Sequence, residues 1–176
     1  MKVTRVCGTI ALALVLQTTL ARFVIGGGFR VDLILIAVVY LALTAGPVTG
    51  LWAGSVGGIA QDVLSGGTVG VSGLAKTIVG FLVGVVGTQF IVVELLHDFL
   101  VFFVANLAHS VCFHGLYVML GSGGTVPTLS AMLGEMLINS LLGVMLMQLI
   151  TLGPDVMARY RIKRANTVRR RLGGRH

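Results

Sequence analysis

Apolar residues run along almost the whole chain, broken only by short segments rich in glycine or in polar residues. Most of these apolar runs approach the roughly 20 residues that a helix needs to cross a bilayer. The pattern predicts six helices, over residues 6–21, 31–45, 47–64, 74–93, 99–120 and 129–152. The first two are short for spanning helices, so we expect them to extend into the neighbouring loops or to lie where the bilayer is thin.

Two of these boundaries have an alternative interpretation. Glycine is favoured just after a helix ends and proline at the first position of a helix, so Gly46-Pro47 predicts a tight turn. The alternative is one kinked helix over residues 31–64. Residues 1–21 also have the basic start and apolar middle of a secretory signal, which is the less favoured interpretation of the first run.

Four glycines, Gly46, Gly50, Gly54 and Gly58, recur at every fourth position of the third predicted helix. Residues four apart lie on one helical face, so the stripe forms a face without side chains. Each glycine costs a helix about 1 kcal/mol relative to alanine. In a bilayer, however, small residues let two helices approach closely. The stripe therefore predicts helix packing or the binding of a partner helix.

The amino-acid composition predicts that lipid, rather than water, surrounds these helices. Of the 176 residues, 56% are hydrophobic and 11% are charged, and the mean hydropathy is +0.99. Soluble domains carry about 25% charged residues, so the chain is predicted to be an all-α integral membrane protein. We expect a transmembrane helical bundle over residues 1–154 and a basic tail over residues 155–176. Cys7 and Cys112 lie in apolar runs and predict neither a disulfide nor a metal site.

The formal net charge of +7 is unevenly distributed, because eight of the thirteen basic residues follow Val156. The bias of lysine and arginine toward the cytoplasm places both termini inside, with Arg22 and Arg30 outside. An even number of spans is then required, either six or four with two re-entrant segments. We expect the tail to anchor the chain at an anionic leaflet and to face cytoplasmic partners. Its basic residues are Arg159, Arg161, Lys163, Arg164, Arg169, Arg170, Arg171 and Arg175, of which the first seven are the candidates for contact with the membrane surface.

Nucleic acid is not an expected partner of this tail. Arginine and lysine attract phosphate, but binding to single strands also depends on aromatic side chains that stack on the bases. Tyr160 is the one aromatic residue that the tail offers.

Ionisable residues inside membrane helices are costly and are therefore functional candidates. Asp62 ends the third predicted helix, Lys76 opens the fourth, and Glu135 lies about two turns into the sixth. With six spans, all three lie toward the outer half of the membrane. We expect Lys76 to pair with Asp62 or Glu135 and to close the outer end of the bundle. The alternative is that each side chain reaches the interface separately.

Four further polar positions suggest a contact between the fifth and sixth helices. Asn106 and His109 share one helical face, and Glu135 and Asn139 share another. If the two faces meet, they form a small hydrogen-bonded cluster. A polar cavity or docking point is one interpretation. We favour interhelical hydrogen bonds, which contribute about 0.6 to 2 kcal/mol each.

The sequence predicts no catalytic residues, metal or cofactor. His109 and His114 are five residues apart and lie about 140° apart around a helix, which does not suit a shared metal ion. Ser110 adjoins His109 but points to another side, and no nucleophile-elbow motif occurs. The charges of Glu94, His97 and Asp98, in the turn between the fourth and fifth helices, are expected to be solvated.

Several positions along the first half of the chain form a recognisable pattern. They are Asp32-Leu33-Ile34-Leu35, Tyr40, Gly46-Pro47, Gly50, Gly54, Gly58, Gln61-Asp62, Ser65-Gly66, Gly70 and Lys76. The most specific part is an aspartate after a glycine-rich helix, followed by a glycine and a lysine before the next span. Over nearly its whole length the chain resembles the bacterial rod shape-determining protein MreD family.

This resemblance implies a role in the cell-elongation machinery at the inner membrane. Members of the family partner the single-span protein MreC, and with it support the RodA glycosyltransferase, its transpeptidase partner and MreB filaments. The implied fold is similar to that of the S components of energy-coupling-factor transporters, and no catalytic residues carry over. We expect the glycine face to allow tight packing and a groove on the bundle to hold the membrane helix of the partner.

Two transport functions are the alternatives. An S component that binds a vitamin needs a polar pocket, for which Glu135, Asn139 and His114 are the candidates. The alanine-x-x-x-alanine motif often seen in the first helix of such proteins is absent, since Gly8 and Ala11 are three apart. A transporter of lipids or sugar carriers is less favoured still, because few polar residues lie inside the predicted spans.

Overall fold

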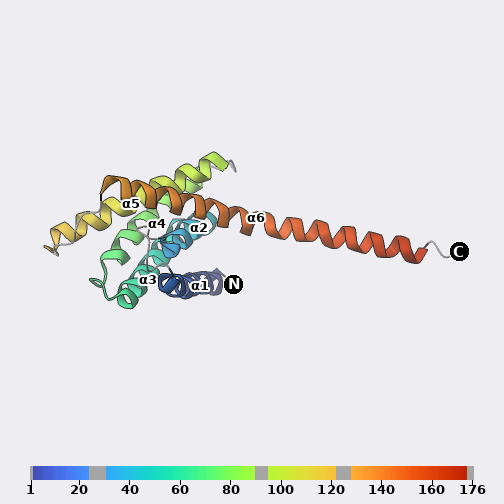
Figure 1. Cartoon of the computed structure of the whole chain (residues 1–176), viewed down its shortest axis with the longest axis horizontal. Helices are drawn as coiled ribbons and strands as arrows, with labels where there is room; N and C mark the ends of the chain where they lie inside the picture. Colours follow the sequence, from blue (N-terminus) through green and yellow to red (C-terminus); the bar gives the residue numbers. More distant parts are fainter. Residues whose placement is uncertain (1, 24–30, 90–94, 122–127, 174–176) are drawn as a thin grey trace.

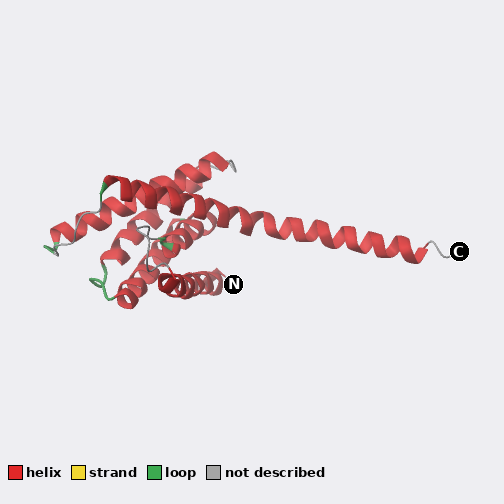
Figure 2. Ribbon diagram, viewed as in Figure 1, coloured by secondary structure: helices red, strands yellow, loops and turns green. Residues whose placement is uncertain are grey.

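The computed structural model describes the backbone of residues 2–23, 31–89, 95–121 and 128–173. It describes side chains over residues 4–19, 31–87, 95–121 and 128–151. The described residues form helices joined by short turns, without strands (Figure 2). The helices are α1 (Lys2–Phe23), α2 (Leu33–Ala45), α3 (Pro47–Ser65), α4 (Val71–Gln89), α5 (Leu95–Met119) and α6 (Leu129–Gly173).

The six predicted helices are all present, and the largest difference is at the end of α6. This helix continues past its predicted end at residue 152 to Gly173, so most of the basic tail is helical. Figure 1 shows α6 leaving the bundle and extending as one long helix toward the C-terminus. Of the two short predicted helices, α1 extends in both directions to 22 residues, whereas α2 has only 13.

The turn at Gly46-Pro47 separates α2 from α3, as predicted, and the kinked-helix alternative is wrong. Gly46 has φ 93° and ψ 176°, and its N–H donates to the carbonyl oxygen of Ala42 at 3.0 Å. A positive φ of this kind favours glycine, and Pro47 follows as the first residue of α3. The chain therefore reverses here, and α3 packs back against α2.

The bundle consists of two parts joined through α2 and α4 (Figure 1). Helices α1 to α4 pack on one another and are called here the four-helix unit. Helices α5 and α6 pack together as a hairpin that contacts α2 and α4. Over the described residues, neither α1 nor α3 contacts this hairpin.

Helix α2 lies at the centre and contacts all five other helices. Its residues Ile34 to Val39 are all buried, and they divide between two apolar clusters. One cluster joins α2 to α1 and α3, and the other joins α2 to α4, α5 and α6. A helix that is apolar all round belongs in the interior, and α2 fits that description.

The exterior of the bundle is apolar and its interior contains polar groups. Large apolar side chains point outward from α3, α4, α5 and α6, and Trp52 of α3 is 62% exposed. The buried polar side chains are Asp62, Ser72, Lys76, Asp98, Asn106, Asn139 and Ser140. Water disfavours such an exterior and lipid favours it. By length and composition, two segments, Leu95–Met119 and Leu129–Thr151, are suited to cross a membrane, and Leu33–Ala45 is among the shorter apolar helices.

Candidate functional site

Helices α3 and α4 meet along a glycine seam that lacks intervening side chains. A methyl group on Gly50 would overlap the backbone of Gly80, and one on Gly54 would overlap the backbone of Lys76. At Gly58, the added carbon would lie 2.5 Å from the Cα of Gly73. The seam therefore requires glycine at these positions of α3, because the opposing atoms are backbone and cannot rotate away.

The opposite side of the seam was not predicted. Gly73, Gly80 and Gly84 of α4 face α3, and a methyl group on Gly84 would overlap Pro47. The spacing of these glycines in the sequence could have indicated a second face of small residues. Gly46, in contrast, has no atom within 4 Å of an added carbon and belongs to the turn.

The seam is covered by α4, so its glycines pack helix against helix within the chain. A partner helix would have to displace α4 to reach Gly50, Gly54 or Gly58. The geometry therefore favours helix packing within the chain over a partner-binding face for three of the four glycines, Gly50, Gly54 and Gly58. Any partner must use another surface.

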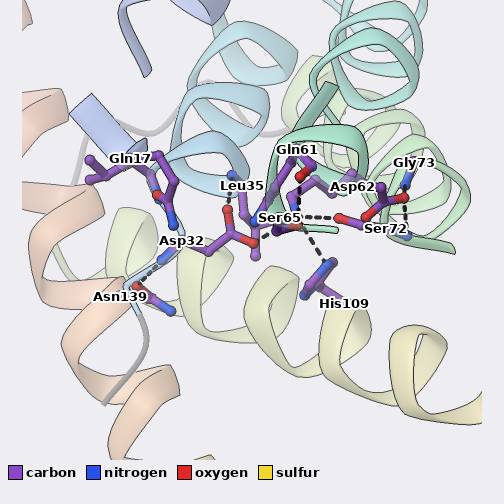
Figure 3. Close-up of polar contacts among 12 residues, drawn as sticks. Gln17, Asp32, Leu35, Gln61, Asp62, Ser65, Ser72, Gly73, His109 and Asn139 are labelled. Carbon is purple, nitrogen blue, oxygen red and sulfur yellow. Dashed lines mark hydrogen bonds and ion pairs between the residues drawn. The ribbon is translucent and has the colours of Figure 1, made fainter. Parts of the chain in front are cut away.

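The second feature is an ion pair between a buried lysine and a partly buried aspartate, at the end of the bundle where α2 and α4 begin (Figure 3). The side chain of Lys76 is 1% exposed, and its Nζ lies 2.7 Å from Oδ2 of Asp32. The same Nζ donates to Oγ of Ser72 at 2.8 Å and lies 3.4 Å from Nε2 of His109. An ammonium group has three N–H donors, so these three acceptors satisfy it.

Lys76 thus has a different partner from the two predicted. The ion pair forms with Asp32, because the carboxylate of Asp62 has another role. Oδ2 of Asp62 accepts from the N–H groups of Gly70 at 2.9 Å, Ser72 at 3.0 Å and Gly73 at 3.4 Å. A carboxylate at a helix N-terminus satisfies N–H groups that lack partners in the helix and interacts well with the helix dipole. Asp62 therefore fixes α4 at the end of α3.

Asp32 also joins the start of α2 to other helices. Its Oδ1 accepts from the N–H of Leu35 at 2.9 Å, which caps α2. Its own N–H donates to Oδ1 of Asn139 on α6 at 3.0 Å. From α1, the amide of Gln17 donates to the carbonyl oxygen of Val31 and accepts from the N–H of Leu33, both at 2.8 Å. Gln17 was missed at the sequence level, although it is a polar residue inside an apolar run.

The polar residues predicted to join α5 to α6 also contact other parts of the bundle. Asn106 is 5% exposed and donates to the carbonyl oxygen of Phe102 in its own helix at 2.8 Å. His109 contacts Lys76 and Asn139 contacts the backbone of Asp32, so both helices of the hairpin meet the four-helix unit through these side chains. Glu135 is partly buried on α6.

The opposite end of the hairpin has a smaller polar contact. Asp98 lies in the first turn of α5 and is only 6% exposed, so the expectation that its charge is solvated is wrong. The amide of Gln148 on α6 donates to Oδ2 of Asp98 at 3.4 Å. Glu94 lies outside the described residues, as do the side chains of the predicted membrane-surface tail.

The sequence matches the family model of the rod shape-determining protein MreD over residues 2–153. The chain belongs to the MreD family. The matched region includes α1 to α5 and the part of α6 that packs in the bundle, so the whole polar network and the glycine seam lie within it. No curated protein and no solved structure matches the chain. MreD is a membrane protein family of the shape-determining machinery and not a known enzyme family.

Proposed function

We propose that this MreD protein is a non-enzymatic membrane scaffold of the bacterial cell-elongation machinery. It binds an MreC-like single-span partner and supports peptidoglycan synthesis by a RodA-type glycosyltransferase and its transpeptidase. The observation that carries the proposal is the arrangement of polar groups within a chain of this family. The recorded contacts of Lys76, Asp32, Asp62 and Asn139 hold helices of the bundle to one another, and the exterior is left apolar for lipid and for other helices.

We further propose that the bundle spans the inner membrane six times, with both termini in the cytoplasm. Two sets of contacts support this topology. Asp32, Asp62, Ser72 and Lys76 meet where α3 ends and where α2 and α4 begin. At the other end, Asp98 near the start of α5 meets Gln148 late in α6. An antiparallel bundle brings together the ends of odd helices and the starts of even ones. Similarity to the S components of energy-coupling-factor transporters is part of the same proposal.

The partner's membrane helix packs on an outward apolar face of the bundle. With the seam covered, the available faces are those that carry exposed large side chains, for example Leu137 and Leu141 on α6. The basic tail faces the cytoplasm, where it contacts the anionic leaflet and MreB-type filaments. Its charge and the helical extension of α6 beyond the bundle support this role.

Copurification tests the scaffold function. The full chain, tagged and produced together with the MreC-like protein of the same bacterium, is extracted in mild detergent, and the partner is quantified. We expect a stable complex, with an unrelated single-span protein as the control. Absence of the MreC-like protein from a folded, monodisperse preparation would contradict the proposal.

Two further measurements separate the alternatives. A thermal-shift screen with vitamins is expected to give no shift, whereas an S component would be stabilised by its ligand. For the topology, single cysteines at Gly67 and Thr49 are labelled from one side of sealed vesicles. We expect opposite accessibility at the two positions, and equal accessibility would exclude six spans.

A further inference from the structure

The ion pair lies at the boundary between the four-helix unit and the α5–α6 hairpin. Lys76 and Asp32 belong to the four-helix unit, and each contacts the hairpin. Lys76 reaches His109 of α5, and the N–H of Asp32 reaches Asn139 of α6. Away from this end, the same boundary consists of apolar packing, in which Phe102 of α5 is fully buried. The polar contacts are therefore concentrated where the hairpin meets the starts of α2 and α4.

The contact between Lys76 and His109 requires a particular protonation state of the imidazole. An ammonium group donates hydrogen bonds and accepts none, so Nε2 of His109 must present a lone pair. The ring is then neutral, with its proton on Nδ1. A second proton on the ring would convert Nε2 to a donor and place two cations 3.4 Å apart. The hydrogen bond would be replaced by a repulsion between the two helices.

We propose that His109 makes this boundary a pH-sensitive latch. The neutral ring ties α5 to Lys76, and the protonated ring releases the α5–α6 hairpin from the four-helix unit at this end. The latch depends on contacts within the chain, so it holds whatever partner the scaffold binds and however the bundle is oriented.

The other charged groups near His109 define what the latch responds to. Lys76 of α4, whose Nζ lies 3.4 Å from Nε2, opposes a second positive charge on the ring, whereas the carboxylate of Asp32 of α2 beside Lys76 attracts one, and His114 lies on the same helix. From α6, Glu135 is the titratable side chain of the described segment. Since Asp32 is already paired with Lys76 at 2.7 Å, the nearest carboxylate is not free to receive a second cation.

The direction of the pH effect follows from linkage. In the released state, the ring behaves as an ordinary imidazole and binds a proton below about pH 6.5. In the latched state, the lone pair of Nε2 is engaged by Lys76. Acid therefore favours release, and each pH unit below about 6.5 raises the ratio of released to latched molecules by up to about tenfold.

Distance measurements between spin labels on α4 and α5 test the latch. Labels are placed on the outward-facing positions Ile78 and Val111 of the full chain in lipid nanodiscs, after Cys7→Ser and Cys112→Ser substitutions. Between about pH 7.5 and about pH 5, we expect a population with longer distances to appear and to grow several-fold.

Two matched substitutions assign the effect. His109→Gln keeps a neutral acceptor that cannot be protonated, and is expected to abolish the response to acid. His114→Gln alters a histidine on the same helix whose Nδ1 lies 2.8 Å from the carbonyl oxygen of Ser110, and is expected to preserve the response. The proposal is overturned if the unsubstituted protein shows no distance change with pH, or if His109→Gln responds to acid as the unsubstituted protein does. The first of these outcomes can be read without any variant at position 109.

Discussion

The α3–α4 pair and the α5–α6 hairpin are both formed by consecutive helices, yet they are held together in different ways. In α3–α4, glycines of the two helices face one another, and backbone meets backbone at Gly50 and Gly80. In α5–α6, a large side chain fills the space, because Phe102 of α5 lies against Gly143 of α6. The first arrangement gains close dispersion contacts along its length but has no mobile atoms to absorb a change. The second can adjust by moving a side chain.

The largest loss of folded protein is expected for a large side chain placed in the glycine seam between α3 and α4. Gly54→Leu would push a branched side chain into the backbone of Lys76 and separate α3 from α4. We expect loss of the folded bundle, since overpacking alone costs about 1–3 kcal/mol even where neighbouring side chains can move. The yield of monodisperse protein in detergent measures it.

Gly115→Leu is the matched control, because no atom lies within 4 Å of a carbon added at Gly115 of α5. The yield of this variant should be near that of the unsubstituted chain. Equal yields for Gly54→Leu and Gly115→Leu would show that the seam is not needed for folding.

The second largest effect concerns the ion pair that joins α2 to α4. Lys76→Met leaves the Asp32 carboxylate without its cation, and removing one partner of a buried pair costs about 3–5 kcal/mol. The double variant Asp32→Asn, Lys76→Met removes both charges and keeps a side chain able to cap α2, so we expect it to recover much of the loss. Thermal unfolding of the four members of this cycle gives the coupling. Additive losses would mean that the two groups do not interact.

A smaller effect is expected when the same change, glycine to alanine, is made in each of the two helix pairs. Gly80→Ala places a methyl group against the backbone of Gly50, whereas Gly143→Ala places one against the ring of Phe102. We expect destabilisation at the upper end of about 1–3 kcal/mol for the first and a smaller loss within that range for the second, because the buried ring can move slightly whereas the backbone cannot. The shift of the thermal midpoint measures both. A larger loss for Gly143→Ala would reverse the comparison drawn above.

The smallest effect is expected at the opposite end of the hairpin. Gln148→Leu removes the amide that donates to Asp98 at 3.4 Å, a long hydrogen bond near the bundle end. The loss should be below about 1 kcal/mol, in the range of interhelical hydrogen bonds in membranes. The same thermal measurement checks it, and a loss as large as that of Lys76→Met would show that this contact is underestimated.

The helices were predictable because their signals are local. Apolar runs end at glycine and polar residues, and Gly46-Pro47 combines a positive φ with a favoured helix start. The glycine stripe of α3 was readable for the same reason. Its partner on α4 was not, since the spacing of Gly73, Gly80 and Gly84 indicates a small-residue face without saying which helix it meets.

The polar network was only partly predictable, because its contacts are long-range. The sequence predicts that Lys76 is an intramembrane charge paired with Asp62, the nearest acid along the chain, or with Glu135. Asp62 instead satisfies the backbone at the start of α4, and Asp32 supplies the counter-charge from the start of another helix. The carboxylate of Asp62 is occupied by backbone N–H groups at the start of α4. The carboxylate of Asp32 comes within reach of Lys76 only because α2 packs against α4.

The position of α2 explains how a helix of 13 residues fits a bundle of longer ones. A span too short for the surrounding hydrocarbon normally forces the bilayer to thin or the helix flanks to stretch. Here protein covers most of the short segment, since Ile34 to Val39 are buried among the other helices, and its exposed residues, Thr44 and Ala45, lie at its end. A mismatch between its length and the hydrocarbon thickness is therefore taken up largely by its longer neighbours.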